Sequence, residues 1–394
     1  MKKYDLKYGT NPAQKPAFIS MADNSDLPFE VLNGKPGYIN FLDALNSYQL
    51  VKELKEALGL AAASSFKHVS PAGCAVGLPL PDRLKKACFL ESFKGLDRSP
   101  LACAYARARG TDPMSSFGDW AALSDICDET TARLIKKEVS DGVIAPGYTD
   151  EALEILKEKK NGNYNIVAID PDYEPETQEN RQVFGINMSQ RIDDQKISND
   201  LLKNIVSKNR DLPDSAKRDL IIGMIALKYT QSNSVALACD GQVIGVGAGQ
   251  QSRIHCTRLA ASKAMVWLYR QMEKTMDLPF KKGLARTAKN NVIDQYVNNY
   301  EEDVTAEGNW QNYFSTRPEP LSLEEKEAFL KSQDGICLIS DAFFPFGDNI
   351  QRAHMAGAEY IAEPGGSVRD DDVIEKADKY NMVLAFTGTR LFHH

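Results

Sequence analysis

The sequence predicts an α/β protein in which helices flank a largely parallel sheet. Three observations lead to this class. Short apolar runs of strand length alternate with helical patterns, for example at residues 150–160 and 164–169. The alternation restarts after residue 200 and continues to the C-terminus. Short motifs of the first half also recur in the second half in the same order, which favours a duplicated unit.

The first half carries the clearest helical spacing at residues 41–54, in a helix that ends by Gly59. The small apolar run at 61–66 predicts a short buried strand, stopped by the Pro/Gly turn that follows. Further helices are expected at 82–94, 99–109, 128–139 and 150–160, and a further strand at 164–169. The acidic, proline-containing segment 170–180 is typical of a surface linker.

The second half begins with a predicted helix at 216–228 and a β-hairpin, in which Asp240 and Gly241 join strands 235–239 and 243–246. A glycine-rich turn then opens a long helix toward Trp267, and a mixed helical region covers 285–331. The remaining elements are expected to be strands at 336–340, 359–362 and 382–387, and helices at about 348–357 and 370–380.

These elements predict three segments. Residues 1–170 form a first α/β subdomain, residues 171–200 form a linker, and residues 201–394 contain a second subdomain with helical insertions. The internal repeat supports this division, because Phe117-Gly118-Asp119 recurs as Phe346-Gly347-Asp348 and residues 144–147 resemble 361–365. Chance can supply any one such match, but their shared order favours duplication.

Composition narrows the class of partner. The 394 residues carry a net charge of −7, so there is no basic surface of the kind that binds duplex nucleic acid. The N-terminus lacks the apolar core of a signal peptide, and no run reaches the roughly 18 apolar residues of a membrane helix. We therefore expect a cytoplasmic protein with small-molecule or protein partners. The seven scattered cysteines are best interpreted as reduced and mostly buried.

Lys67 and His68 stand side by side at the exit of the predicted strand 61–66. Strand ends often carry chemistry in α/β folds, so the pair is a candidate catalytic site. A surface lysine beside a partly buried, hydrogen-bonded histidine is an equally good interpretation of this segment alone. The other motifs of the chain have to decide between the two.

Several common motifs are absent or incomplete. The glycines at 245, 247 and 249 do not meet G-x-G-x-x-G and follow a hairpin strand, which opposes a dinucleotide site, although Arg253 and the helix start there could hold an anion. The histidines show no H-E-x-x-H, and no C-x-x-C pair accompanies His68, which opposes a zinc deaminase. No G-x-S-x-G marks a serine nucleophile.

Taken together, nine motifs resemble AICAR transformylase, the phosphoribosylaminoimidazolecarboxamide formyltransferase family of purine synthesis. The motifs occur in order at residues 7–12, 32–40, 65–73, 114–119, 138–147, 228–235, 247–257, 340–346 and 390–394. The resemblance implies two cytidine-deaminase-like α/β subdomains with mixed sheets flanked by helices, without zinc. It also implies a homodimer with shared active sites. Because the chain starts where the transformylase unit starts, ring closure by a cyclohydrolase domain is not expected from it.

The resemblance implies formyl transfer from 10-formyltetrahydrofolate to the 5-amino group of AICAR nucleotide. Neutral histidine is a suitable general base at cellular pH, so His68 is assigned that role. A cationic lysine suits stabilisation of the tetrahedral oxyanion and proton delivery to the folate nitrogen, which is the role given to Lys67. Each residue is carried over by its position in a matching motif.

The implied ligand contacts fall into three groups. The nucleotide would be held by Lys7, Tyr8, Asn40, Gly118, Asp141, Phe392 and, from the partner subunit, Asn233 and Arg253. The folate would lie against Met114, Ser115, Phe117, Ile254, Phe343, Pro345, Phe346, Asp348, Ser367, Val368 and Arg390. Family members can also hold a potassium ion, and a structural one is implied near Thr230, Ser232, Ser234, Asp341 and His393.

One position departs from the family pattern, which usually has arginine where this chain has Lys7. A lysine ammonium contacts a phosphate as a single point charge, whereas an arginine guanidinium can donate two parallel hydrogen bonds to it. The contact at Lys7 is therefore expected to be less well oriented, unless another cation such as Lys160 compensates.

Two rival functions stay open. One is a catalytically silent nucleotide or folate binder, which the intact Lys67-His68 pair opposes, and the other is a zinc deaminase, which the absent ligands oppose.

Overall fold

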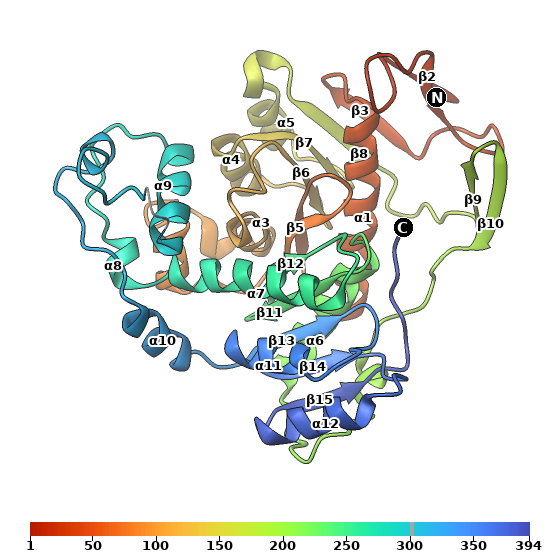
Figure 1. Ribbon diagram of the computed structural model, residues 1–394. Helices are drawn as coiled ribbons and strands as arrows, with labels where there is room; N and C mark the ends of the chain where they lie inside the picture. The colour runs from red at the N-terminus through yellow and green to blue at the C-terminus, as the bar shows by residue number, and fades with distance from the viewer. Residues whose placement is uncertain (300–302) are drawn as a thin grey trace.

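One mixed sheet runs through both halves of the chain in the computed structural model, which describes residues 1–299 and 303–394 (Figure 1). Its strand order is β15-β14-β13-β11-β12-β5-β4-β6-β7-β8-β3. The strands of the first half are β3 (Phe29–Asn33), β4 (Ala62–Phe66), β5 (Pro71–Val76), β6 (Asp119–Leu123), β7 (Ser140–Ala145) and β8 (Asn165–Ile169). Those of the second half are β11 (Val235–Cys239), β12 (Gln242–Gly247), β13 (Ile336–Ser340), β14 (Ala358–Glu363) and β15 (Val383–Phe386). The predicted α/β class is confirmed.

The strand order repeats between the halves. β4 lies antiparallel to both β5 and β6, and β6, β7 and β8 run parallel to one another. β11 is likewise antiparallel to β12 and β13, and β13, β14 and β15 run parallel. The halves meet where β5 pairs with β12 at Ala75 and Gln242. The mixed sheet implied by the family resemblance is therefore confirmed. The largely parallel sheet inferred from the alternation of strands and helices was wrong, because each half starts with an antiparallel hairpin. The cytidine-deaminase-like assignment and the subdomain boundaries stay predictions.

Helices cover both faces of the sheet. They are α1 (Tyr38–Leu58), α2 (Asp82–Ala87), α3 (Pro100–Thr111), α4 (Glu129–Lys137), α5 (Asp150–Lys157), α6 (Asp214–Lys228), α7 (Arg253–Tyr269), α8 (Glu273–Met276), α9 (Arg286–Asn298), α10 (Leu323–Lys331), α11 (Asp348–Met355) and α12 (Asp370–Lys379). Successive strand residues point to opposite faces, so Ala62 packs into the core under α1 and α6 and Ala63 into the core under α3 and α7. No helix in the described residues is long and apolar enough to span a membrane.

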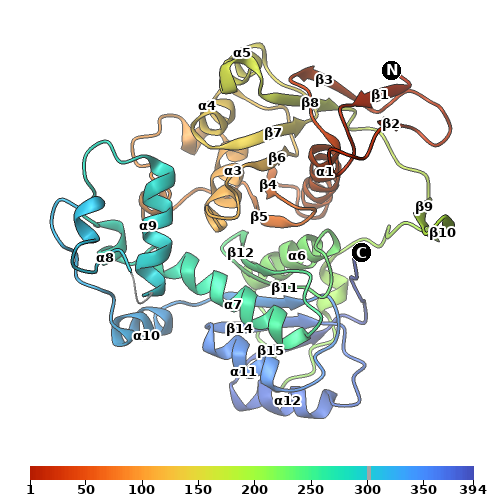
Figure 2. The same ribbon diagram turned by 45° about the horizontal axis from the view of Figure 1, so that its top comes forward.

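Helices α8, α9 and α10 form a lobe beside α7, with its own small core around Tyr296 and Phe314 (Figures 1 and 2). This lobe is the predicted mixed helical region. The N-terminal turn of α9 lies next to the residues that connect α4 to β7, because Arg286 on α9 pairs with Glu138 at 2.8 Å.

Three local expectations were wrong. The helix expected at 82–94 ends at Ala87, and Phe89 then adopts a positive φ of 54° that a helix cannot contain. The helix expected at 150–160 ends at Lys157, since Lys160 and Asn161 are left-handed. The strand expected at 61–66 does end at Phe66, but Pro71 and Gly73, which were expected to form a turn, belong to strand β5. Pro71 occupies the first position of that strand, where its missing N–H costs no ladder bond.

Two small antiparallel hairpins were not predicted. β1 (Lys3–Leu6) pairs with β2 (Ala17–Ser20) near the N-terminus. β9 (Gln178–Val183) pairs with β10 (Ile186–Arg191) inside the segment expected to be a linker. This second hairpin stands away from the main sheet in both views, and all twelve residues of its strands are exposed (Figures 1 and 2).

Candidate active site

Lys67 and His68 lie in the tight turn that connects β4 to β5. The turn is closed by a hydrogen bond from the Lys67 N–H to the Ser70 carbonyl at 3.0 Å. His68 and Val69 at its centre both have positive φ, 54° and 59°. Two consecutive left-handed residues are the pattern of a type I′ hairpin turn, which normally uses asparagine and glycine. A histidine and a β-branched valine there store backbone strain of the kind that clusters at functional sites.

Asp43 on α1 holds this turn in place and was not identified from the sequence. Its Oδ1 accepts a hydrogen bond from the Val69 N–H at 2.7 Å, and its carboxylate interacts electrostatically with His68. Burial raises the pKa of Asp43, although the Val69 hydrogen bond and the His68 charge oppose the shift. The sequence signal was weak, because the buried side of α1 carries a second carboxylate, Glu53, as well as Asp43. His68 itself is exposed, so its imidazole is accessible to a ligand.

The loop 114–118 packs against the side chain of Lys67. Lys67 Nζ donates a hydrogen bond to the Phe117 carbonyl at 2.5 Å. Gly118, with φ of 76°, lies so close that a β-carbon there would be 4.0 Å from the same ammonium. Because β4 is antiparallel to β6, the end of β4 meets the starts of β6 and β7. The Gly118 N–H also donates to the Val139 carbonyl at 2.9 Å, so Gly118 and Asp141 lie at the same edge.

A buried polar layer supports this edge. The Ser65 hydroxyl contacts Ser116 Oγ at 2.7 Å and Asp119 Oδ2 at 2.5 Å. Burial raises the pKa of Asp119 to about 6, in spite of the Arg109 guanidinium at 3.7 Å. Burial also lowers the pKa of Lys159 to about 8, and its ammonium donates to the Glu138 carbonyl at 2.7 Å. Lys159 was missed because a lysine-rich run is usually a solvated helix end.

The other predicted nucleotide residues of the first half have structural partners. Lys160 Nζ binds Asp141 Oδ1 at 2.7 Å. Asn40 Oδ1 accepts from the Gly37 N–H at 2.9 Å at the start of α1. Lys7 is exposed and its ammonium lies 6.0 Å from the ring centre of Tyr8. No contact in the described residues joins these side chains to His68, so their common pocket stays a prediction.

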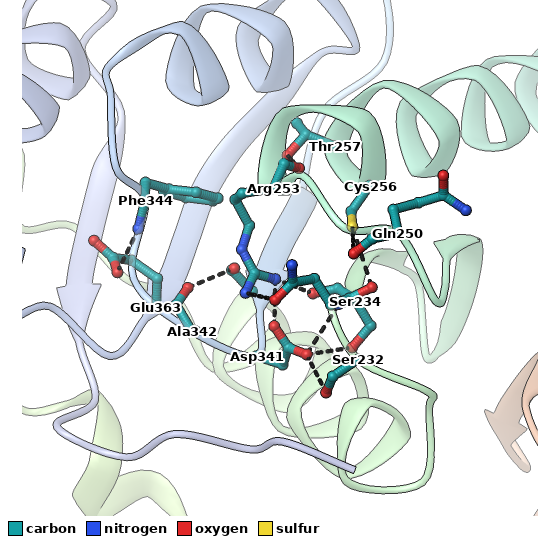
Figure 3. A network of polar contacts seen from close by, with 12 residues as sticks. Ser232, Ser234, Gln250, Arg253, Cys256, Thr257, Asp341, Ala342, Phe344 and Glu363 are labelled. Atoms are coloured by element: carbon teal, nitrogen blue, oxygen red, sulfur yellow. Dashed lines mark hydrogen bonds and ion pairs between the residues drawn. The ribbon is translucent and has the colours of Figure 1, made fainter. Parts of the chain in front are cut away.

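Arg253 and Asp341 form the centre of a second polar cluster (Figure 3). Arg253 at the start of α7 is 7% exposed and pairs with Asp341, while its guanidinium also donates to the Ser234 carbonyl at 2.9 Å and to Asn233 Oδ1 at 3.0 Å. Asp341 Oδ2 accepts from Ser232 Oγ at 2.7 Å and from Ser234 Oγ at 2.9 Å. Asn233 and Arg253 are thus brought together as predicted, but Arg253 is occupied by internal partners.

The same cluster contains most of the residues predicted to hold potassium. Ser232 and His393 exchange hydrogen bonds of 3.0 Å, and burial lowers the pKa of His393. The Thr230 hydroxyl points elsewhere, to the Ala226 carbonyl at 2.7 Å. In this arrangement Arg253 supplies the positive charge at Asp341, which does not favour a bound cation. Within residues 1–299 and 303–394, no group of three or more His, Cys, Asp or Glu side chains is placed to hold a metal ion.

The predicted folate residues lie in two places. Met114 and Phe117, which are 39% and 50% exposed, line a cavity of about 350 Å³ beside α9. In the same loop, the Ser115 N–H donates a hydrogen bond to Asp112 Oδ1 at 2.9 Å. The remaining predicted folate residues belong to the second half of the chain. They lie at the starts of α7 and α11 and in the loops that follow β13, β14 and β15. These residues are Ile254, Phe343, Pro345, Phe346, Asp348, Ser367, Val368 and Arg390. Several of these are exposed, and the Arg390 guanidinium lies 4.6 Å from the ring centre of Phe392.

Glu363 at the end of β14 is a buried carboxyl near this second group. Its Oε2 accepts from the Gly365 N–H at 3.0 Å, while Oε1 has no hydrogen-bond partner. Burial raises the pKa of Glu363 from its ordinary value of 4.5 to about 7. Between these values the folded state holds a proton that the unfolded state has lost, so this group's contribution to stability falls as the pH rises from 4.5 to 7.

We therefore expect Glu363→Gln, which stays neutral, to raise the free energy of unfolding at pH 8 by on the order of 2 kcal/mol relative to the wild type. The difference should fall to a few tenths of a kcal/mol near pH 4.5, where the glutamate is protonated in the folded state and half protonated in the unfolded state. Urea unfolding at both pH values measures it. Exposed Glu375 on α12 provides the control, since Glu375→Gln should change the free energy of unfolding by the same amount at both pH values. If Glu363→Gln also differs from the wild type by the same amount at both pH values, the prediction is contradicted.

Comparison with known proteins gives one consistent family. Residues 1–263 match the family model described as AICARFT/IMPCHase bienzyme. The bifunctional purine biosynthesis protein PurH of Roseobacter denitrificans is 32% identical over 394 residues, covering 99% of this chain and 59% of that protein. The protein of the same name from Clostridium acetobutylicum is 30% identical over 397 residues, covering 100% of this chain and 59% of that protein. The chain thus spans about three fifths of the length of these relatives.

Proposed function

This chain belongs to the AICARFT/IMPCHase bienzyme family, and we propose that it transfers the formyl group of 10-formyltetrahydrofolate to the 5-amino group of AICAR nucleotide, giving FAICAR and tetrahydrofolate. The reaction belongs to purine biosynthesis, in keeping with the names of the relatives, and we propose that it takes place in the cytoplasm. The observation that carries the proposal is the strained turn that presents Lys67 and His68 at the edge shared by β4, β6 and β7.

The amine of AICAR nucleotide is a poor nucleophile, since its lone pair is delocalised into the ring and the carboxamide. Attack on the formyl carbon therefore requires removal of a proton as the C–N bond forms. His68 is exposed, and Asp43 fixes the backbone beside it, so its imidazole is well placed to accept that proton. The C–N bond to the folate nitrogen then breaks, and that nitrogen leaves with a proton.

Lys67 stabilises the oxyanion of the tetrahedral intermediate. An ammonium has three N–H donors, and the Phe117 carbonyl uses one of them. The other two remain for the developing oxyanion and for proton delivery to the folate nitrogen. The contact with Phe117 also orients the long side chain, which reduces the freedom lost when the ligand binds.

The test is a formyl-transfer assay on the purified chain with AICAR nucleotide and 10-formyltetrahydrofolate. Because the named relatives are bifunctional, the same preparation is also assayed for conversion of FAICAR to IMP. Formyl transfer without ring closure is the expected result. Ring closure without formyl transfer would replace the proposal with a cyclohydrolase, and binding of both ligands without turnover would favour a silent binder.

We also propose that the protein acts as a homodimer, and the β9–β10 hairpin supports this. Its alternate residues Val183, Ile186 and Met188 share one face, and Phe184 at the tip is 100% exposed. The opposite face carries Gln182 and Asn187. Arg181, opposite Met188, shares the first face, so that face is apolar toward the tip. A two-stranded hairpin is marginally stable alone in water, so this apolar tip needs a covering surface, and a second copy would supply it.

We expect the double variant Ile186→Ser, Met188→Ser to weaken the dimer by about tenfold or more, because both changes remove apolar contact area from the proposed interface. Analytical ultracentrifugation over a concentration series measures the dissociation constant. Asn187→Ser on the polar face is the matched control and should leave it unchanged. Equal dissociation constants for the three proteins would exclude the hairpin from the interface.

A further inference from the structure

A cavity of about 570 Å³ lies between α1 and the segments that precede and follow the β9–β10 hairpin. Its other walls are β2, the residues that lead into β3 and the end of α6. None of the predicted catalytic, nucleotide or folate residues is among its lining residues. Small-molecule sites have volumes of about 300 to 1,000 Å³. The cavity therefore has room for a ligand that the proposed reaction does not use.

Much of the lining is apolar or aromatic. Leu27, Phe29 and Ile169 line the cavity, and each of them is at most 8% exposed. The side chains of Tyr173 and Tyr229 line it as well. Apolar and aromatic side chains dominate small-molecule sites, where they cover the body of the ligand. A ligand of this cavity should therefore have an aromatic or branched apolar body.

Tyr48 on α1 is a buried polar residue of the lining without a polar partner. It is 5% exposed, and its hydroxyl makes no hydrogen bond in the described part of the chain. Burial raises the pKa of Tyr48 to about 12, and the charge of Asp170 adds to the shift. The phenol is thus neutral at cellular pH and can accept a hydrogen bond. Since buried hydroxyls are normally hydrogen-bonded, this one indicates a ligand that carries a donor.

The charged side chains select the sign of that ligand. Six carboxylates and three ammonium groups line the cavity, which leaves an excess of three negative charges. Each ammonium group is paired with a glutamate of the same lining at 2.8 to 2.9 Å: Lys52 with Glu174, Lys196 with Glu56 and Lys228 with Glu53. Asp194 pairs with Arg191, which is not a lining residue.

The two other aspartates of the lining have no cationic partner among the described residues. Asp170 and Asp193 each accept a hydrogen bond from a backbone N–H of their own loop, at 3.0 and 3.3 Å. Both charges reach aromatic side chains of the cavity. Asp170 acts on Tyr48, and Asp193 acts on Tyr229, whose pKa is raised by burial, by Glu53 and then by Asp193. This unpaired negative charge favours a cation.

We propose that this cavity binds an organic cation, an amine with an aromatic or branched apolar body. The body lies against Phe29 and Ile169. The ammonium group donates a hydrogen bond to the Tyr48 hydroxyl and is attracted by the unpaired charges of Asp170 and Asp193. The faces of the tyrosine rings add cation–π attraction. The same carboxylates repel anions, so nucleotides and folates are not ligands of this cavity.

The test is a fluorine NMR titration of the full chain with three probes of similar shape. At pH 7.5, 2-(4-fluorophenyl)ethylamine is a cation, 2-(4-fluorophenyl)ethanol is neutral and 3-(4-fluorophenyl)propanoate is an anion. We expect the dissociation constant of the amine to be about threefold or more below that of the alcohol. The propanoate should bind most weakly of the three.

Two variants locate the amine. Asp170→Asn keeps the oxygen that accepts the backbone hydrogen bond and loses the charge, so it should fold and raise the dissociation constant of the amine about threefold. Tyr48→Phe keeps the ring and should raise it by a similar factor, because the hydroxyl acceptor is lost. Asp211→Asn is the matched control, since Asp211 is exposed and does not line the cavity, and it should leave amine binding unchanged.

Three results would overturn the proposal. If the amine binds no more tightly than the alcohol, or less tightly than the propanoate, the cavity does not select a cation. If neither Asp170→Asn nor Tyr48→Phe weakens amine binding, the probe binds elsewhere. If none of the three probes binds at millimolar concentration, the cavity is not a ligand site. Formyl transfer stands or falls independently, because its assay involves none of these residues.

Discussion

His68→Ala is expected to lower kcat for formyl transfer by about 10²- to 10⁴-fold, because it removes the group that takes the proton from a poorly nucleophilic amine. The KM values should change much less, since the imidazole acts mainly in the transition state. The pH profile should change as well, as the variant loses the rise in rate that follows deprotonation of the base. Steady-state kinetics across pH measures all three.

His68→Asn separates chemistry from folding. His68 has a φ of 54°, and asparagine enters the left-handed region more readily than alanine, so His68→Asn should keep the turn while it lacks the base. His354→Asn on α11, another exposed histidine, is the matched control and should retain wild-type kcat. A fully active, folded His68→Asn would remove His68 from the mechanism.

The sequence was informative where local chemistry decides the structure. The Asp240-Gly241 hairpin was predicted because those residues permit a tight turn between strands, and both strands lie within one residue of the expected bounds. The hairpin turn at 67–70 was not predicted, because His68 and Val69 carry no turn signal and the turn is held by residues distant in the sequence, among them Asp43 and Gln231. The hairpin β9–β10 was missed for the same reason, since Phe184-Gly185 is not a common turn pair.

In the candidate site, too, some contacts follow from local sequence patterns, and others depend on how distant elements pack. Lys67, Phe117 and Gly118 come from two predicted motifs and lie close together, because both segments end at one edge of the sheet; their roles stay predictions. Asp43 was missed because its role depends on α1 packing over β4, which no local pattern records. Asn233 and Arg253 were predicted to contact the same nucleotide and are hydrogen-bonded to each other, while that contact stays a prediction. The buried partner of Arg253, Asp341, was expected only as a potassium neighbour, since this pairing spans 88 positions of the sequence.

Asp341 is the residue on which the second polar cluster depends (Figure 3). Its carboxylate is 0% exposed and accepts hydrogen bonds from the backbone and hydroxyl of Ser234 and from Ser232, in addition to Arg253. Removal of the carboxylate leaves a guanidinium that is 7% exposed without a counter-charge. An unpaired buried charge is much more costly than the loss of an exposed ion pair.

We therefore expect Asp341→Ala to lower the free energy of unfolding by about 3–5 kcal/mol, measured by the urea midpoint at constant slope. Asp341→Asn should fall between wild type and Asp341→Ala, because it keeps an acceptor for Ser232 and Ser234 but loses the charge that pairs with Arg253. Asp200→Ala, which breaks an ion pair with Lys203 whose side chains are 76–77% exposed, is the matched control and should cost less than about 1 kcal/mol. A cost for Asp341→Ala as small as that of the control would mean that Arg253 finds other partners or water when Asp341 is gone, and that the cluster does not stabilise the fold.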